Sequence, residues 1–502
     1  MKYKLYLTAC LLVLGLSCAH AVPAKKGVKR TLKLADGTSV VAELKGDEFA
    51  SYWQADDGKC YVQDIDSRTF KITDKAQVVN RGLAKRQKAN DERIKRFAKR
   101  GPKREITGAF SHFTGTKKGL IILVNFKDVK FGRTHTRTMF DNIANKIGFT
   151  NSLGFKGSVK DYFLAQSNGQ FELDFDVVGP YTLSQNMAYY GAHSKDGLQD
   201  VKPGHMILEA CQMADKDVNY KDYDWDGDGE VDQVFVIYAG FGEADGGSED
   251  TIWPHESQLS TWVSKPYETK DGVSVNTYAC GNENTYDMLG RSRINGIGTI
   301  CHEFSHCLGY PDLYDTNYSN FGMGSFDLMC SGSYNGESFC PPNYSAYEKW
   351  VAGWIKPTIL DKPASVKGMQ AQDVKYGQAF VVYNDNNKNE YYLIENRQQN
   401  VGVWDKLLPA SGMMITHVDY DENIWEWNNV NTIVNYSNQY GPEYAYRDND
   451  HQRLTIFHAD NEEGSSADSQ AGDLYPFNGN NCLTDTSSPA ATIYQGGTTM
   501  GK

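Results

Sequence analysis

The sequence predicts an α+β fold in which a mixed helical and stranded core lies between two β-rich regions. Two continuous apolar runs, at residues 119–126 and 234–240, are typical of strands buried within a sheet. Residues 297–308 carry apolar side chains at helical spacing, which predicts an amphipathic helix. After Trp354 the pattern changes to short β-type runs separated by Asn, Asp and Gly turns. These observations place a mixed domain in the middle of the chain and a β-sandwich-like domain after it.

The start of the chain predicts export. Lys2 and Lys4 precede an apolar run over residues 5–16 that is too short for a membrane span. Ala19-His-Ala21 is a small-residue cleavage site, so we expect residues 1–21 to be a signal peptide and the exported chain to begin at Val22. We expect no membrane-spanning segment and a secreted, periplasmic or extracellular location.

The charge of the chain is divided. Residues 22–105 hold 21 Lys and Arg against 12 Asp and Glu, whereas residues 106–502 hold 28 against 51. A basic segment beside an acidic body predicts two parts that attract each other. The basic residues concentrate at 81–104 without interleaved aromatic residues, which argues against nucleic-acid binding. We interpret this run as an exposed connector that follows a helix and is open to proteolysis, with a plain solvated linker as the alternative.

Residues 301–312, Cys-His-Glu-Phe-Ser-His-Cys-Leu-Gly-Tyr-Pro-Asp, predict a metal site. His302 and His306 lie at i and i+4, so both imidazoles can reach one metal from one helix face. Gly309 can end the helix in a left-handed conformation and let the chain return with Asp312 as a third ligand. Glu303 is positioned to take a proton from an attacking water, and one coordination position stays open, as a catalytic zinc requires.

A turn of small residues follows at 327–336 and contains Met329. A His-Glu-x-x-His-x-x-Gly-x-x-(His/Asp) helix followed by a methionine turn resembles the metzincin pattern, in which the methionine forms an apolar floor under the metal. Alone, Met329 would be interpreted as an ordinary core residue.

The chain further resembles the immune-inhibitor-A-like (M6) family of secreted metalloproteases. The resemblance covers roughly residues 118–430. It is carried, besides the zinc helix, by Gly-Ser-Val-Lys-Asp-Tyr-Phe at 157–163, Phe-Asp-Val-Val-Gly-Pro at 175–180, Tyr-Asp-Trp-Asp-Gly-Asp-Gly-Glu-Val-Asp at 223–232, Ile-Trp-Pro-His at 252–255, Tyr-Glu-Lys-Trp-Val-Ala-Gly-Trp at 347–354 and Glu-Asn-Arg-Gln at 395–398.

This resemblance implies a zinc metalloendopeptidase with His302, His306 and Asp312 as zinc ligands and Glu303 as general base. Glu348 remains a rival third ligand, because a glutamate on a later helix completes the metal in another class of zinc protease. Tyr334, just after the methionine turn, is a candidate for assisting the oxyanion.

The expected organisation has four parts. Residues 1–21 form the signal peptide, 22–110 a small β-rich propeptide that inhibits the same chain, 111–358 the metzincin-like catalytic domain, and 359–502 the C-terminal β-rich domain. Protein or peptide substrates are expected. The alternative is an inactive, calcium-dependent binding or adhesion protein on a protease-like scaffold, which an intact Glu303 disfavours. A zinc hydrolase acting on other substrates is a third possibility.

A second cation site is predicted in an acidic turn. The carboxylates of this turn occupy positions 1, 3, 5 and 9 of a calcium loop, and a backbone carbonyl would supply position 7. Position 12 is Phe235, so the loop is not a complete EF-hand, and an ion-free acidic turn is the alternative. The residues concerned are Asp224, Asp226, Asp228, Glu230 and Asp232.

Several further assignments stay open at this stage. Eight cysteines follow the signal peptide, and their pairing cannot be deduced from sequence. Cys60, Asp56 and Asp57 are candidates for blocking the zinc before activation. We expect residues 238–243 to form the strand edge that binds extended substrate. The scattered histidines His417, His451 and His458 show no ligand spacing and are expected to be structural.

Overall fold

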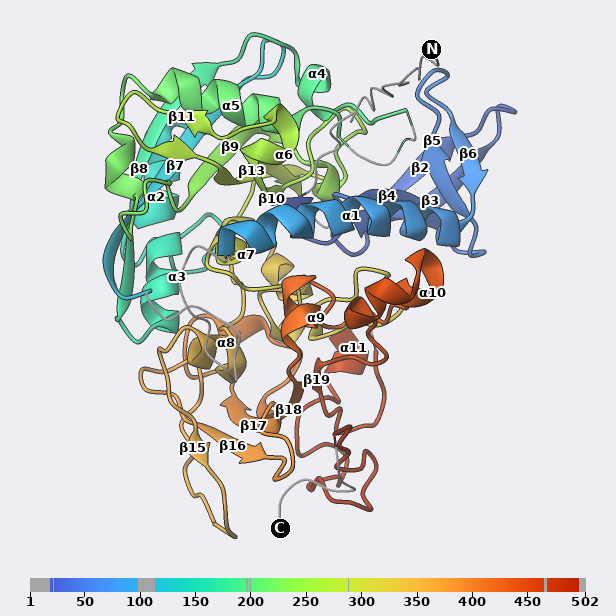
Figure 1. Cartoon of the computed structure of the whole chain (residues 1–502), viewed down its shortest axis with the longest axis vertical. Coiled ribbons are helices and arrows are strands. Elements are labelled where there is room, and N and C mark those ends of the chain that lie inside the picture. The colour runs from blue at the N-terminus through green and yellow to red at the C-terminus, as the bar shows by residue number, and fades with distance from the viewer. Residues whose placement is uncertain are drawn as a thin grey trace, which may run out of the picture.

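The computed structural model describes residues 19–20, 22–97, 113–195, 197, 200–287, 289–464 and 467–495. Residues 1–18 and 21 of the expected signal peptide lie outside the described residues, as do residues 98–112, which include the last part of the expected connector. Three sheets of five or more strands organise the described residues, and Figure 1 shows them in separate regions of the molecule.

The N-terminal region is a five-stranded antiparallel meander followed by a long helix. Sequential strands pair in the order of the chain, as the alternating runs and Asp-Gly turns of the sequence predict. The elements are β2 (Lys29–Lys33), β3 (Ser39–Asp47), β4 (Ala50–Ala55), β5 (Cys60–Gln63), β6 (Phe70–Thr73) and α1 (Lys75–Phe97).

Helix α1 corrects the connector that we expected at residues 81–104. Its residues 81–97 are helical, so only the part beyond Phe97 is left as a connector. The helix crosses the middle of the molecule, between the central sheet and the C-terminal region (Figure 1). Val78 packs against β4, and Leu83 packs against Val434 and Tyr436 of the C-terminal region. These contacts hold the basic segment as a helix, which charge density alone does not reveal.

The central sheet is largely parallel. Its strand order is β1-β10-β13-β9-β7-β8, with β14 paired to β13. Strands β8, β7, β9 and β13 run parallel, and β10 runs antiparallel to β13. The strands are β1 (Ala19–His20), β7 (Gly115–Asn125), β8 (Phe171–Thr182), β9 (Val234–Phe241), β10 (His255–Gln258), β13 (Thr277–Tyr286) and β14 (Ser292–Ile294).

Both buried strands predicted from apolar runs are present as β7 and β9. Alternate residues of β7 face opposite cores, with Ile121 in one cluster and Leu120 in the other, as strand geometry requires. The predicted substrate-binding edge at 238–243 is wrong. Most of that segment belongs to β9, which is buried between β13 and β7, whereas β10 lies toward the edge of the sheet and pairs with β1.

Helices cover both faces of this sheet. Helices α2, α3 and α7 contribute to one core cluster and α5 to the other. The helices are α2 (Arg137–Asn145), α3 (Val159–Gln166), α4 (Met187–Gly191), α5 (Pro203–Ala214), α6 (Leu259–Val263), α7 (Ile297–Cys307) and α8 (Ala346–Val351). Short 3-10 helices are η1 (Tyr220–Tyr223), η2 (Glu243–Asp245), η3 (Gly324–Phe326) and η4 (Ser331–Tyr334), and β11 (Tyr267–Glu268) pairs with β12 (Ser274–Val275).

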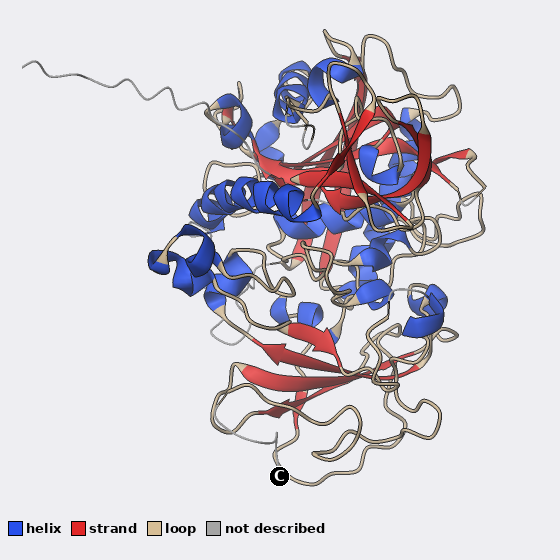
Figure 2. Cartoon of the chain, turned by 90° about the vertical axis from the view of Figure 1, so that its right-hand side faces the viewer, coloured by secondary structure: helices blue, strands red, loops and turns tan. Residues whose placement is uncertain are grey.

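The C-terminal region contains one five-stranded sheet rather than the two sheets of the expected sandwich. Figure 2 shows this sheet set apart from the central one. One face shares a continuous core with the central domain, through residues such as Leu393 and Met414. Loop residues cover the other face, including Phe457 and Tyr475. In the described residues, loops therefore provide the layer that a second sheet would provide in a sandwich.

The strands of this sheet are β15 (Thr358–Ile359), β16 (Ala379–Tyr383), β17 (Glu390–Arg397), β18 (Gly412–Asp419) and β19 (Leu454–Ile456). The helices of this region are α9 (Glu422–Glu426), α10 (Tyr436–Tyr440) and α11 (Ala467–Gln470), with η5 (Asp405–Leu407) and η6 (Pro442–Arg447). The eight described cysteines are all free thiols, and seven of them are buried. Among the described helices, none is both long and apolar enough to cross a membrane.

Candidate metal centre and cleft

Helix α7 is buried along its whole length. Its apolar stripe, Ile297, Cys301, Phe304 and Leu308, lies in the main core cluster, as the sequence predicts. The helix begins at Ile297, directly after Gly296. A side chain at Gly298 would lie 1.9 Å from the Ser333 carbonyl oxygen, so glycine permits the close approach of the turn that follows.

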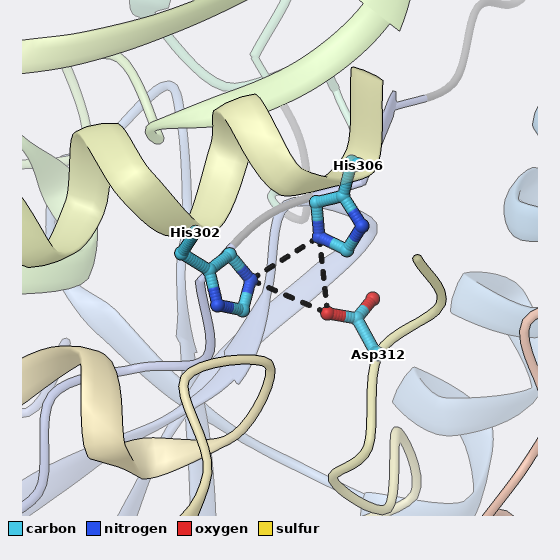
Figure 3. A group of neighbouring side chains, drawn as sticks. All are labelled: His302, His306 and Asp312. Carbon is cyan, nitrogen blue, oxygen red and sulfur yellow. Dashed lines mark hydrogen bonds and ion pairs between the residues drawn. The ribbon is translucent and has the colours of Figure 1, made fainter. Parts of the chain in front are cut away.

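The two histidines of α7 converge with Asp312 (Figure 3). The Nε2 atoms of His302 and His306 lie 3.2 Å apart. Asp312 Oδ1 lies 3.4 Å from His302 Nε2 and 3.2 Å from His306 Nε2. All three side chains are fully buried, and burial together with the neighbouring imidazole holds the pKa of His302 below its ordinary value, despite the hydrogen bond to Asp312.

Backbone carbonyls fix the orientation of both imidazoles. His302 Nδ1 lies 2.8 Å from the Leu328 carbonyl oxygen, and His306 Nδ1 lies 2.8 Å from that of Tyr310. If each Nδ1 carries the proton and donates it, each Nε2 presents a lone pair to the centre. This pattern of outer hydrogen bonds is typical of histidine that binds a metal.

The chain reaches Asp312 through the turn that the sequence predicts at Gly309. Gly309 has a φ of +100°, outside the range that other residues adopt easily. Asn428 then clamps Asp312 from both sides: Asn428 Nδ2 donates to Asp312 Oδ2 at 2.7 Å, and the Asp312 amide donates to Asn428 Oδ1 at 2.6 Å. Asn428 lies 116 residues further along the chain, so no local pattern could identify it.

The donor set fits zinc. Two imidazole nitrogens and a carboxylate oxygen are common zinc ligands, and a tetrahedral ion with bonds of about 2.0–2.1 Å separates its ligands by about 3.3 Å. The separations of 3.2–3.4 Å agree with that value. Burial alone would raise the pKa of Asp312, but the two imidazoles hold it well below its usual range, so this carboxylate is ionised and able to bind a cation.

Glu303 faces the same centre and contacts the N-terminal segment. Its Oε1 accepts a hydrogen bond of 2.7 Å from the backbone amide of Val22. The indole of Trp253 donates to the Val22 carbonyl at 2.9 Å, and the Tyr334 hydroxyl donates to the Pro23 carbonyl at 2.7 Å. Residues 22 and 23 therefore occupy the cleft beside Glu303, and Tyr334 contacts the chain that fills it.

Met329 is fully buried in the main core, and its carbonyl accepts from the Leu313 amide, just after Asp312. Glu348, the rival third ligand, lies elsewhere. Its carboxylate accepts from the amide and hydroxyl of Ser345 in a capping box at the start of α8. Among the described residues, the possible metal ligands that gather with His302 and His306 include Asp312 and not Glu348.

The candidates for blocking the zinc lie away from it. Asp56 and Asp57 have exposed side chains and pair with Lys29 and Lys59. Cys60 is buried in a small apolar cluster with β4 and α1, and its thiol contacts the Gly58 carbonyl. Their positions follow from the meander, which turns these residues toward solvent or its own core.

The turn between β3 and β4 instead brings Asp47 and Glu48 toward the centre. Both are buried, and Arg86 of α1 pairs with Asp47 at 2.5 Å. Neither carboxylate oxygen of Glu48 has a hydrogen-bond partner in the described residues. Burial and the negative charge of Asp47, opposed by Arg86 and reinforced by Asp312, raise the pKa of Glu48 well above its ordinary value. Neither acid could be identified from the sequence, because an Asp-Glu pair in a turn usually indicates a solvated loop.

A second buried cluster supports the wall of the cleft. His193, Asp200 and Glu243 place possible ligand atoms within 4.8 Å of one another. His193 Nε2 lies 2.8 Å from Glu243 Oε2, and Asp200 accepts from the amide of Trp253 at 2.9 Å. The hydroxyl of Ser51, from the N-terminal region, donates to Glu243 at 2.8 Å. This cluster holds Trp253 in position against the segment in the cleft.

The acidic turn brings together part of the expected calcium set. Asp224, Asp226 and Asp232 gather possible ligand atoms within 4.8 Å, whereas Asp228 and Glu230 are not in that group. The Asp228 carboxylate accepts from the Glu230 amide at 2.8 Å. The scattered histidines that the sequence predicts to be structural each pair with a carboxylate, His417 with Glu390, His451 with Asp419 and His458 with Asp473.

A buried His-Glu-x-x-His helix with a third carboxylate, set against a largely parallel sheet, has the form of a metallopeptidase centre. Residues 112–359 match the family model described as immune inhibitor A peptidase M6, catalytic domain. In this domain the chain is similar to the catalytic domain of the M6 peptidases.

Two named relatives support the assignment. The chain is 26% identical over 281 residues to the pre-pro-metalloprotease PrtV of Vibrio cholerae serotype O1, a match covering 49% of this chain and 30% of PrtV. It is 26% identical over 296 residues to immune inhibitor A of Bacillus thuringiensis subsp. alesti, covering 50% of this chain and 42% of that protein. The chain thus matches less than half the length of each relative.

The His193–Glu243 pair predicts a loss of stability at alkaline pH. Burial alone would lower the pKa of His193, but Glu243 and then Asp200 raise it to about 9. The unfolded value is about 6.5, so protonated His193 stabilises the fold fully below that pH, by on the order of 3 kcal/mol. This gain is lost as pH rises through about 9. Melting temperatures of the intact chain and His193→Gln should therefore converge between pH 6.5 and 9.5, and a constant difference would contradict the assignment.

Proposed function

We propose that the chain is a secreted zinc metalloendopeptidase made as an inactive precursor. The observation that carries the proposal is the convergence of His302, His306 and Asp312 beside Glu303 in a fully buried site. The similarity of residues 112–359 to the M6 catalytic domain supports hydrolysis of peptide bonds in proteins. The leader-like residues 1–21, which include the Ala-His-Ala cleavage site, support secretion.

In the proposed mechanism, His302, His306 and Asp312 hold the ion, and the Leu328 and Tyr310 carbonyls and Asn428 keep them oriented. Bound zinc supplies Lewis-acid polarisation of the scissile carbonyl and lowers the pKa of water. Glu303 takes a proton from the attacking water and returns it to the leaving nitrogen. Tyr334, whose hydroxyl already contacts a carbonyl in the cleft, is suited to hold substrate or the developing oxyanion.

The alternative is an inactive, calcium-dependent binding protein. The cluster of Asp224, Asp226 and Asp232 supports bound calcium, with Asp228 and Glu230 as further ligands in our proposal. Such an ion would stabilise the loop that joins η1 to β9 at the side of the domain. Calcium in that loop is compatible with catalysis, and the complete metal set with Glu303 favours the enzyme.

We further propose residues 22–110 as a propeptide that inhibits the same chain, 111–358 as the catalytic domain and 359–502 as the C-terminal domain. Contacts between the first two parts support inhibition. Arg30 pairs with Glu249 at 2.8 Å and Arg68 with Asp250 at 2.8 Å. Residues 22 and 23 occupy the cleft at Glu303. The opposite net charges of the two parts strengthen this docking.

Glu303→Gln should abolish proteolysis and keep the metal. The amide cannot accept the proton of the attacking water, whereas the three ligands are unchanged, so we expect casein hydrolysis to fall by at least about 10²-fold. Plasma emission spectrometry should still find one zinc per chain. Glu268→Gln, an exposed residue of β11, is the matched control and should behave as the parent chain. Substantial activity in Glu303→Gln would refute the assigned role.

Asp312→Asn and Glu348→Gln distinguish the two candidate third ligands. Both changes keep size and remove one charge. Asp312→Asn should lose zinc affinity and activity together, because the ligand charge is removed from the centre. Glu348→Gln should retain zinc, because that side chain caps α8. Competition with a chelating dye measures both affinities, and the reverse pattern would make Glu348 the ligand.

Cleavage in the connector should release activity. Trypsin can cut at Lys99, Arg100, Lys103 or Arg104. The cut chain should be at least several-fold more active than the intact chain.

Arg30→Ala should raise the activity of the uncut chain, because it removes the partly buried pair with Glu249. Lys33→Ala, an exposed residue of the same strand, is the control. Added salt should act in the same direction by screening these charges. Full activity without cleavage would leave residues 22–110 as a permanent domain.

A further inference from the structure

The segment that fills the cleft begins at the residue where the leader is expected to end. The Ala-His-Ala site predicts cleavage between Ala21 and Val22. The backbone nitrogen of that same Val22 lies 2.7 Å from Glu303 Oε1. The cleavage site in the sequence and the contact in the structure are independent observations, and both identify the backbone nitrogen of Val22.

The position of this nitrogen gives the orientation of the segment. A general base in peptide hydrolysis returns its proton to the leaving nitrogen, which must therefore lie within hydrogen-bond distance of it. The Val22 nitrogen occupies that position beside Glu303. Residues from Val22 onward thus lie where the leaving half of a substrate lies. β1 (Ala19–His20) pairs antiparallel with β10 on the other side of this point, where the acyl half would lie.

Groups of the cleft bind the main chain of residues 22–25 closely. Trp253 donates to the Val22 carbonyl at 2.9 Å and Tyr334 to the Pro23 carbonyl at 2.7 Å. The amide of Lys25 donates to the Ala244 carbonyl at 2.9 Å, whereas that of Ala24 donates to the Gly46 carbonyl within the N-terminal region itself. Pro23 has no amide hydrogen to satisfy and a fixed φ, which lowers the entropy cost of binding.

The side chains at the two ends of the segment are also bound. Val22 is 1% exposed and packs in one cluster with Trp253 and Ala244. The ammonium of Lys25 donates to the Thr285 hydroxyl and to the Tyr286 carbonyl, each at 2.9 Å. The cleft therefore offers an apolar site for the residue after the scissile bond and a polar site three residues further on.

We propose that this cleft binds residues 22–25 as the leaving half of a cut peptide, and that leader removal creates an α-ammonium at Val22 which pairs with Glu303 and keeps the precursor inactive. The inference rests on the proposed function, because it takes Glu303 as the general base. A leader peptidase adds water across the Ala21–Val22 bond, leaving a carboxylate on Ala21 and an α-amino group on Val22. That group is largely protonated at neutral pH, with a pKa of about 7.7–8.0 in model peptides.

The consequence is a change in the character of the contact. Before cleavage, the neutral amide of Val22 donates to the Glu303 carboxylate, and afterwards the donor itself carries a positive charge, so an ion pair replaces a hydrogen bond from a neutral group. β1 departs with the leader, so the half of the cleft along β10 is vacated while the other half stays filled. The precursor is then inhibited by a group that resembles its own reaction product.

Chemical labelling tests the ion pair without using activity. The full-length chain, shown by Edman sequencing to begin at Val22, is treated at pH 7 with limiting acetic anhydride and analysed by mass spectrometry. We expect the α-amino group of Val22 to react at least tenfold more slowly than in the urea-unfolded chain. Lys33, which is exposed, should react alike in both and serves as the internal control.

Glu303→Gln separates the charge effect from simple burial. The amide carries no charge, so protection of the Val22 amine should fall by several-fold or more in this variant. Labelling of the parent chain at the unfolded rate, or equal protection in Glu303→Gln, would overturn the proposal. Because Glu303→Gln needs no activity for this measurement, a failed peptidase assay would count against the proposed function and leave this result standing.

Moving the amine tests inhibition directly. One glycine inserted between Ala21 and Val22 shifts the new N-terminus by about 3.5 Å and leaves the residues that follow unchanged. We expect the uncut precursor with this insertion to hydrolyse casein several-fold faster than the parent precursor. The matched control is a glycine inserted after Gly37, in the open turn between β2 and β3, which should leave inhibition intact. Equal inhibition in both insertion variants would overturn the proposal.

Discussion

The structure depends on one constraint: three polar side chains that are fully buried must be satisfied by one another and by fixed partners. His302, His306 and Asp312 meet at 3.2–3.4 Å inside the protein, where an unsatisfied polar group costs about 1–3 kcal/mol or more. The spacing of the helix, the left-handed turn at Gly309 and the clamp by Asn428 all serve this meeting. The donors then form a site that a divalent cation fits.

The N-terminal region packs beside the same centre. It brings a sheet, a helix and a short segment against the cleft, and its basic side chains pair with acids of the central domain. It also brings Asp47 and Glu48 near the centre, where Arg86 opposes their charge. Acids close to a metal centre are favourable only where positive charge is available, so this packing is itself suited to a bound cation. Docking and metal binding would then support each other.

The sequence predicted the elements that depend on local pattern. The helix over 297–308, both buried strands and the strands of the N-terminal meander are all present, because periodicity and turn residues are local properties. The site residues on α7 converge because i and i+4 share a face. The edge assignment at 238–243 failed because a run buried on both faces marks the interior of a sheet rather than its edge.

The features that could not be predicted from the sequence depend on contacts between residues far apart along the chain. Asn428 and Glu48 lie more than 100 residues from the helix they approach, and neither belongs to a recognisable pattern. The contact of Val22 with Glu303 spans 281 residues. The single C-terminal sheet differs from the expected sandwich because loops can cover a sheet face, and loop packing has no periodic signal. The full length of helix α1 could not be predicted from its basic sequence, because the helix is stabilised by contacts with two other regions.

The proposed chemistry depends on a zinc ion held by His302, His306 and Asp312. Crystals of the full-length chain can be grown with zinc and measured on both sides of the zinc absorption edge. We expect one strong anomalous peak within about 2.2 Å of both Nε2 atoms and an oxygen of Asp312. Zinc bound elsewhere in the catalytic domain, with no peak between these three side chains, would contradict it.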